Sequence, residues 1–231
     1  MKIEINAEGL KCPEPIMLLH KAVRESQDGD LIELTATDKS TERDVEKFCN
    51  FLGHKLLENK QWLLDKRPKG MPTDECWKLN EVEVPPLNKG EVLIKILYLS
   101  IDPYMRGRMN DGESYADPAA LGEPMTGESV GVVIESESDK YMKGDYLCVH
   151  KGWQTHIIAN DEDPTLFKAD PSIVPLQTYL GTVGMPGRTA YFGLLRVGLP
   201  KSGETIVVSA ASGAVGSVVG QMGKILGCRV I

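Results

Sequence analysis

The sequence predicts an α+β two-layer sandwich of order βαβαβ, followed by a β-rich domain and by a final strand–turn–helix unit. Three observations support this prediction. Residues 2–58 alternate between hydrophobic patterns typical of strands and of helices. Residues 61–198 hold short apolar runs separated by prolines and glycines, which favour a β-rich domain with long loops. Residues 199–231 contain a buried strand, a glycine turn, an apolar helix and the start of another strand.

The N-terminal pattern begins with a strand and a helix. In KIEIN, Ile3 and Ile5 fall on one face of a strand, and Gly9 provides the turn that follows. A helix is expected over residues 13–26, because apolar residues recur there at helical spacing. The stretch GDLIELTATD then alternates again and predicts the second strand.

A second helix and a third strand complete the expected sandwich. Thr41 is a candidate N-cap with Asp44 three residues later, and Gly53 is placed to end the helix. The apolar stripe of this helix consists of Val45, Phe48, Cys49 and Leu52. HKLLE, residues 54–58, is expected to form the third strand, so that two helices cover one face of a small sheet.

The composition is that of an ordinary globular protein, with 42% hydrophobic and 26% charged residues among 231. A formal net charge of −7 gives no electrostatic reason to bind nucleic acid or an anionic membrane surface. We expect a cytoplasmic protein, since the first residues are strand-like and no apolar run approaches the roughly 20 residues of a membrane helix. The cysteines are odd in number and scattered, which favours free thiols: Cys12, Cys49, Cys76, Cys148 and Cys228.

Cys12 stands between a turn glycine and two prolines, at the start of the first helix, in GLKCPEPI. The positive end of the helix dipole favours a thiolate there. Pro13 and Pro15 lack N–H donors and Glu14 adds a negative charge, so we expect only a modest lowering of the thiol pKa. The alternative is that the motif is a helix start and nothing more.

The stretch GLKCPEPIMLLHKAV resembles the TusA/SirA-like sulfur-carrier family, in which a Cys-Pro-x-Pro motif opens the first helix. TDKSTERDVEKFCNFLGHKLL resembles the second half of that family. The resemblance covers most of residues 2–58 and implies that Cys12 carries a persulfide between a sulfur donor and a sulfur acceptor protein. QWLLDKR stands where the family has its last strand. Cys49 lies on the apolar stripe and is expected in the core.

From Gln61 onward the chain resembles the zinc-free medium-chain reductases, in the branch of prostaglandin, alkenal and curcumin reductases. The matching stretches include LYLSIDPYMRGRMND, LGTVGMPGRTAYFGLL and GETIVVSAASGAVGSVVGQMGKILGCRVI. The resemblance implies a GroES-like domain over 61–198 after a carrier domain over 1–60, and a Rossmann unit over 199–231. It also implies NADPH as cofactor and a small enone or enal as substrate.

The glycine turn SAASGAVGSVVG follows the strand ETIVVSA, with Gly213, Gly216 and Gly220 in the positions of a nucleotide-binding turn. Such a turn lets the backbone approach a pyrophosphate at a helix N-terminus, although any tight strand-to-helix turn also favours glycine. The predicted cofactor-binding residues are Gly213, Ala214, Val215, Gly216 and Ser217, with Thr189 near the nicotinamide by resemblance.

By the same resemblance Tyr104 lines the enone pocket. Arg106 and Arg108 are either exposed charges or loop anchors. Arg188 stands where relatives usually have an aliphatic residue. Tyr191 and Phe192, which closely follow Thr189 in the sequence, are expected to pack in the core.

No metal site is expected. Cys148 and His150 fall on one face of a strand and His156 is near in sequence, but the dense ligand spacing of a structural zinc site is absent.

Two functions from different classes therefore remain open. The chain is a sulfur carrier that acts through Cys12, or it is part of an oxidoreductase with an accessory N-terminal domain. The Rossmann pattern in this sequence extends only as far as its second strand, which suggests a fusion or a fragment. An uncovered Rossmann sheet predicts that residues 203–231 are poorly protected from amide exchange or drive self-association.

Overall fold

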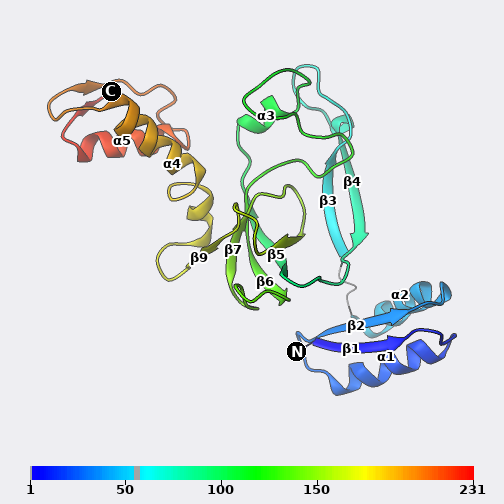
Figure 1. Ribbon diagram of the computed structural model, residues 1–231. Coiled ribbons are helices and arrows are strands. Elements are labelled where there is room, and N and C mark those ends of the chain that lie inside the picture. Colours follow the sequence, from blue (N-terminus) through cyan, green and yellow to red (C-terminus); the bar gives the residue numbers. More distant parts are fainter. Residues whose placement is uncertain (1, 55–57) are drawn as a thin grey trace. The chain divides into compact units, whose positions relative to one another are not determined.

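The structure is a computed structural model that describes residues 2–54 and 58–231. Internal contacts divide the chain into two compact units, Met1–Leu57 and Glu58–Ile231. Figure 1 shows the first unit in blue and the second from cyan to red. No helix among the described residues is both long enough and apolar enough to cross a membrane.

The first unit follows the predicted order through its second helix. Its elements are β1 (Lys2–Ala7), α1 (Glu14–Glu25), β2 (Leu31–Ala36) and α2 (Ser40–Leu52). The two strands pair in parallel, with Ile3 opposite Ile32, and α1 packs against both strands and against α2. The strand expected at residues 54–58 falls mainly on 55–57, which lie outside the described residues. Glu58 itself begins a strand of the second unit.

The second helix begins one residue before the predicted cap. Its first residue is Ser40, whose N–H and hydroxyl both donate to Oδ1 of Asp38, at 3.0 and 2.9 Å. Thr41 is inside the helix and buried, so the expectation that it caps the helix is wrong. The capping prediction fails because Asp38, two residues before Ser40, accepts the hydrogen bonds at the start of the helix. Gly53 ends the helix in the left-handed conformation, as expected.

The second unit begins with a β-rich part. Strands β3 (Glu58–Leu64) and β4 (Trp77–Glu83) form an antiparallel pair. A five-stranded antiparallel sheet follows in the order β8-β5-β6-β7-β9. Its strands are β5 (Glu91–Leu99), β6 (Ser129–Ser136), β7 (Tyr146–Val149), β8 (His156–Asn160) and β9 (Phe167–Ala169). The short helix α3 (Tyr104–Arg108) lies between β5 and β6 in the chain.

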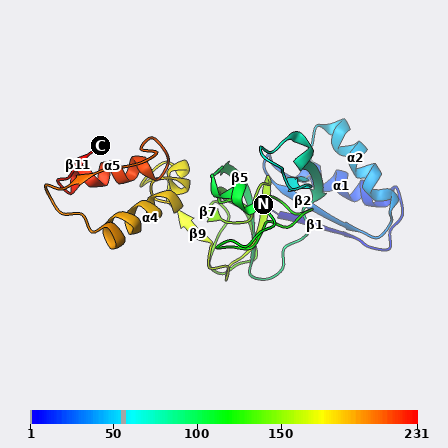
Figure 2. The same ribbon diagram turned by 90° about the horizontal axis from the view of Figure 1, so that it is seen from above.

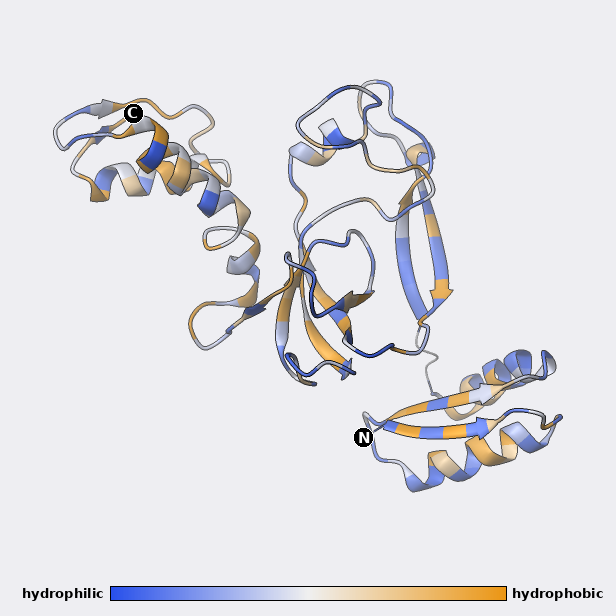
Figure 3. Ribbon diagram, viewed as in Figure 1, coloured by the Kyte–Doolittle hydropathy of each residue, from blue (hydrophilic) through white to orange (hydrophobic). Residues whose placement is uncertain are grey.

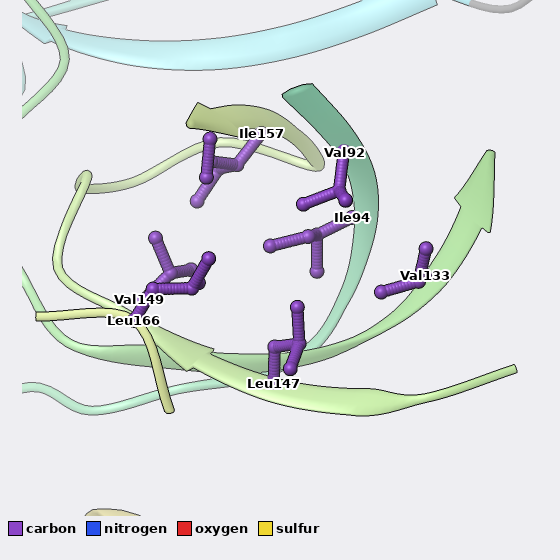
Figure 4. Close-up of a cluster of buried hydrophobic side chains, with 8 residues drawn as sticks. Val92, Ile94, Val133, Leu147, Val149, Ile157 and Leu166 are labelled. Carbon is purple, nitrogen blue, oxygen red and sulfur yellow. The ribbon is translucent and has the colours of Figure 1, made fainter. Parts of the chain in front are cut away.

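The sheet encloses the main apolar core of this part. Alternate residues of each strand point inward, as the period of two requires. Figure 4 shows side chains from four strands pointing toward one another, and hydrophobic colours run along β5, β6 and β7 in Figure 3. The buried cluster consists of Val92, Ile94, Val133, Leu147, Val149, Ile157, Ala159 and Leu166.

Gly131 in β6 is required by a close approach of two strands. A Cβ at this position would lie 2.3 Å from the backbone oxygen of Lys95 in β5. The ladder between β5 and β6 shifts register nearby, between Ile96 and Tyr98. Glycine therefore allows the irregular contact that bends the sheet.

The last part of the second unit is a parallel strand pair with a crossover helix. β10 (Thr205–Ile206) and β11 (Arg229–Val230) pair in parallel, with α5 (Gly216–Ile225) between them in the chain. The segment before them, which the sequence placed in the β-rich domain, contains η2 (Leu176–Leu180), α4 (Met185–Phe192) and the π-helical turn η3 (Gly193–Gly198). Helix α4 packs against α5, as Figures 1 and 2 both show.

Candidate functional sites

Cys12 lies at the exposed tip of the loop that joins β1 to α1. Gly9 turns this loop with a φ of +77°, and its N–H donates to Oγ1 of Thr37 at 2.9 Å. Helix α1 starts at Glu14, with Pro13 as its N-cap. The loop is therefore tied to the end of β2 while the cysteine is presented to solvent just before a helix N-terminus.

Two carboxylates contact Cys12 directly. Its backbone N–H donates to Oδ2 of Asp38 at 3.3 Å, and its thiol donates to Oδ2 of Asp44 at 3.1 Å. Asp38 follows β2, and Asp44 lies in the first turns of α2. The stretch TDKSTERD thus contributes two carboxylates that contact Cys12. The sequence pattern indicates only a helix-capping role for Asp44.

These carboxylates reverse the expected effect on the thiol. The pKa of Cys12 is raised, chiefly by the hydrogen bond to Asp44, then by partial loss of water and by the charges of Asp44 and Asp38, while Arg43 acts in the opposite direction. The hydrogen bond from Cys12 contributes most to lowering the pKa of Asp44. The expectation of a modestly lowered thiol pKa is therefore wrong, because a fold-dependent contact outweighs the helix dipole.

Cys49 is half-buried in α2, not fully enclosed in the core. Burial alone raises the pKa of its thiol. Its side chain therefore lacks both the exposure and the loop setting of Cys12.

A cleft of about 940 Å³ in the second unit contains most of the other predicted site residues. It is lined by Tyr104, Thr189 and the turn from Gly213 to Gly216, whereas Ser217 is not among its lining residues. Arg108, His150 and Arg188, which the sequence analysis considered in other roles, also line the cleft. The polar lining groups that carried no sequence signal are Asp102, Tyr115, Glu128 and Ser209.

The glycine turn is shaped by close backbone contacts. A Cβ at Gly216 would lie 2.4 Å from the oxygen of Ala210, and one at Gly213 would lie 3.1 Å from the same oxygen. Ala210 itself has a φ of +50°. The turn thus brings backbone to the cleft at the N-terminus of α5, which fits the pyrophosphate of a dinucleotide.

Close packing of α5 on its sheet depends on Gly223. A Cβ there would lie 3.0 Å from Val230 and 3.1 Å from Ile206. Gly220, the third glycine of the predicted motif, would make only an ordinary contact of 3.8 Å with Val230. Helix-to-strand packing therefore uses a glycine outside the motif.

Tyr104 begins α3 and presents a free hydroxyl. Among the described residues its Oη is buried and has no hydrogen-bond partner. Burial, assisted by the charges of Asp102 and Glu128, raises the pKa of Tyr104 to about 12. The ring stacks near that of His150, with centroids 6.5 Å apart. A neutral hydroxyl donor is thus available to a ligand in the cleft.

His150 lies in the cleft beside this hydroxyl. Its Nε2 is 3.1 Å from Oγ1 of Thr126. Burial, with the nearby Arg108 cation, lowers the pKa of His150. Cys148, two residues earlier, is fully buried with Val130 and Leu180. Among the described residues no group of three His, Cys, Asp or Glu side chains is arranged to hold a metal.

Glu128 ties the β-rich part to helix α4. This nearly buried carboxylate accepts from the backbone N–H of Met185, the first residue of α4. Its Oε1 also lies 3.5 Å from Nη2 of Arg188. Burial raises the pKa of Glu128, with Arg188 opposing the shift. The residue that precedes β6 therefore positions the helix that carries Thr189 into the cleft.

The remaining predictions near the cleft have mixed outcomes. Arg106 is a loop anchor, since its guanidinium donates to the oxygen of Gly70 at 2.7 and 3.1 Å. Thr189 donates to the oxygen of Met185 at 2.8 Å. The expectation that Tyr191 and Phe192 are core residues is wrong, because they are 44% and 56% exposed. They lie on the face of α4 that the described residues leave uncovered.

Comparison with known proteins identifies both segments by class. Residues 3–65 match the family model of sulfurtransferase TusA, and residues 60–167 match that of the N-terminal domain of oxidoreductases. The two matches overlap in β3, which pairs within the second unit. The chain therefore joins a TusA-like segment to one with the GroES-like and Rossmann-type fold of medium-chain reductases.

The second segment is similar to NADPH- and NADP⁺-dependent reductases. The chain is 45% identical over 180 residues to NADPH-dependent curcumin reductase of Escherichia coli (strain K12), covering 78% of this chain and 52% of the relative. It is 45% identical over 179 residues to the NADP⁺-dependent 2-alkenal reductase of Nicotiana tabacum, covering 76% and 52%. The chain spans about half the length of these relatives.

A solved structure agrees with this assignment. CurA from Vibrio vulnificus superimposes with a TM-score of 0.69 at 45% identity, over 74% of this chain and 50% of CurA. The complex of CurA with NADPH gives a TM-score of 0.68. Both resemblances suggested by the sequence are thus confirmed.

Proposed function

We propose that the first unit carries sulfur as a persulfide on Cys12. The observation that supports this most directly is the exposed thiol, held before a helix N-terminus inside the TusA-like match. In the loading step the Cys12 thiolate attacks the outer sulfur of a donor persulfide R–S–SH. A new S–S bond forms, the old one breaks, and the products are Cys12–S–SH and R–S⁻.

Activation of Cys12 needs a partner. The raised pKa keeps the resting cysteine protonated near neutral pH. A sulfur donor protein that pairs a cation with Asp44, or brings a base to the Cys12 thiol, would free the thiolate at the moment of transfer. The proposed partners are therefore a sulfur donor and a sulfur acceptor protein. All five cysteines are unpaired, which supports a reducing compartment such as the cytoplasm.

Intact-mass measurement tests this proposal. The chain is incubated with a cysteine desulfurase and cysteine, and we expect a gain of one sulfur atom that reductant reverses. Cys12→Ser should abolish the gain, and Cys49→Ser is the matched control that should retain it. A gain that persists in Cys12→Ser, or no gain at all, would sink sulfur carriage at Cys12.

We propose that the second unit belongs to an NADPH-dependent reduction of α,β-unsaturated carbonyl compounds. The supporting observation is that Tyr104, Thr189 and the glycine turn line one cleft. NADPH, when bound, supplies a hydride. The turn at Gly213 and Gly216 would hold its pyrophosphate, and Thr189 would face the nicotinamide. Tyr104 would donate a hydrogen bond from its free hydroxyl to the carbonyl oxygen of an enone or enal.

A binding titration tests the cofactor part. We expect NADPH to bind the full chain, and Gly213→Ala to weaken it several-fold, because the added methyl group enters the tight turn. Gly193→Ala is the control, since a Cβ there meets nothing within 4 Å. Absence of NADPH binding by the folded wild-type chain would favour the alternative function, in which Cys12 alone is active.

A further inference from the structure

Arg188 is a cation on the wall of the cleft that the proposed reaction does not use. Its side chain is 55% exposed and lies among the cleft-lining residues. Among the described residues Arg188 forms an ion pair with Glu128, in which Nη2 of Arg188 lies 3.5 Å from Oε1 of Glu128. A guanidinium has five N–H donors in a fixed fork, so a single contact of this length leaves most of its capacity to a ligand.

Besides this ion pair, Arg188 contacts an aromatic ring. Its guanidinium carbon lies 5.8 Å from the ring centroid of Phe167. The apolar lining of the cleft includes Met185 and Pro186, which are near Arg188 in the chain, and Val207 and Val208. These apolar residues can contact an apolar ligand body, and Arg188 is placed to meet an anionic group on it, although Asp102, Arg108 and Glu128 also line the cleft.

The ion pair with Glu128 uses only part of the hydrogen-bonding capacity of the Arg188 guanidinium. The carboxylate is only 11% exposed, and it also accepts from the backbone N–H of Met185. Its charge is thus divided between the N-terminus of α4 and Arg188. An incoming carboxylate can therefore use the remaining N–H groups of Arg188 while Glu128 keeps its contact through Nη2.

We infer that Arg188 binds a carboxylate group of the cleft's ligand, so that the chain prefers enones that carry an anionic group on an apolar body. This inference rests on the proposed reductase function. The contacts of Arg188 are with β9 and with the residue that precedes β6, not with the glycine turn. A substrate carboxylate is for that reason a better match than a phosphate of the dinucleotide.

The experiment compares two ligands that differ by one charge. Benzalacetone and its para-carboxylated analogue are titrated calorimetrically into the full chain, with and without NADPH. We expect the carboxylated compound to bind roughly tenfold more tightly, with a smaller preference at high salt because the site is half-exposed. Arg188→Leu should remove the preference, and Arg188→Lys should keep part of it.

Two further variants separate binding from a merely structural effect. Glu128→Gln should increase the preference, because it removes a competing negative charge while keeping an acceptor for Met185. Arg188→Leu and Glu128→Gln would thus act in opposite directions, although both break the same ion pair. Arg196→Leu, an exposed arginine outside the cleft lining, should change nothing.

The remaining outcomes are each decisive. Equal binding of the two enones would overturn the inference and leave the proposed reductase function intact. A wild-type chain that binds NADPH but neither enone would overturn the inference together with the proposed substrate class. Loss of NADPH binding in Arg188→Leu, with no change in the preference between enones, would assign the arginine to a cofactor phosphate and overturn the inference.

Discussion

The thiol of Cys12 donates a hydrogen bond to Oδ2 of Asp44, with sulfur and oxygen 3.1 Å apart. The two residues are 32 positions apart in the chain and meet because β1 and β2 are parallel neighbours. The carboxylate favours the protonated form of the sulfur. The exposed cysteine is therefore held as a thiol at rest, and its reactivity depends on what approaches Asp44.

Replacing Asp44 should make Cys12 more reactive. In Asp44→Asn the thiol loses its strongest acceptor and a nearby negative charge, so the pKa of Cys12 should fall and its alkylation near neutral pH should accelerate several-fold. The pH dependence of iodoacetamide labelling, followed by peptide mass spectrometry, measures both quantities. Asp38→Asn should accelerate labelling less, because Asp38 contacts the backbone N–H and acts on the sulfur only through its charge.

Unchanged labelling in Asp44→Asn would contradict the contact between the two side chains. Slower labelling would mean that Asp44 acts as a base for the thiol. The labelling of Cys49 in the same sample provides the internal control, since burial alone raises the pKa of its thiol.

Gly131→Ala should destabilise the second unit. The added Cβ would lie 2.3 Å from the oxygen of Lys95, so two strands must separate or bend. Such overpacking costs about 1–3 kcal/mol, which lowers the Tm of a unit this size by roughly 2–12 °C. Gly107→Ala is the control, because a Cβ there meets nothing within 4 Å and the residue is helical. Equal Tm values for the two variants would disprove the strand contact.

Lowering the pH should destabilise the folded second unit over a pH range that is set by the pKa values of two histidines. Burial lowers the pKa of His150 and of His156 from the ordinary 6.5. The folded state then holds fewer protons than the unfolded chain, so stability falls as the pH drops through 6.5 toward the lowered values, and the pair contributes little pH dependence well above 6.5.

Thermal unfolding at about pH 7.5 and about pH 5.5 measures this effect. The double variant His150→Gln, His156→Gln should lose less Tm between the two values than the wild type does. Carboxylates with lowered pKa values, such as Asp145, lose their contribution at lower pH and do not mask it. An equal loss of Tm in both proteins would mean that other groups control the acid response.

Local patterns predicted the elements, because each depends on neighbours in the chain. The alternation of Ile3 and Ile5 and the glycine after α2 are confirmed for this reason. The contact between Cys12 and Asp44 could not be predicted, since it depends on which loop lies beside which helix. The sign of the thiol pKa shift was wrong for the same reason.

In the cleft too, features that depend on local sequence were predicted, whereas contacts between distant parts of the chain were not. The glycine turn was predicted from its strand–turn–helix order, and Tyr104 was predicted by resemblance. Glu128 carries no sequence signal of its own, because its neighbours read as an ordinary strand start. Its partners Met185 and Arg188 come from a helix 60 residues away, and only the fold brings them together.

The last prediction concerns the apolar surface of the β10–α5–β11 region. Val207, Ile225 and Ile231 are 77%, 84% and 59% exposed, although each belongs to or adjoins a strand or helix that normally packs. An uncovered apolar surface favours association between copies. We expect the chain to self-associate with rising concentration in sedimentation experiments. Ile225→Lys should shift it toward the monomer, whereas Met142→Lys, which changes another large hydrophobic residue that is 69% exposed in the β-rich part, should not. A chain that stays monomeric at every concentration, with slow amide exchange throughout residues 203–231, would refute self-association through this surface.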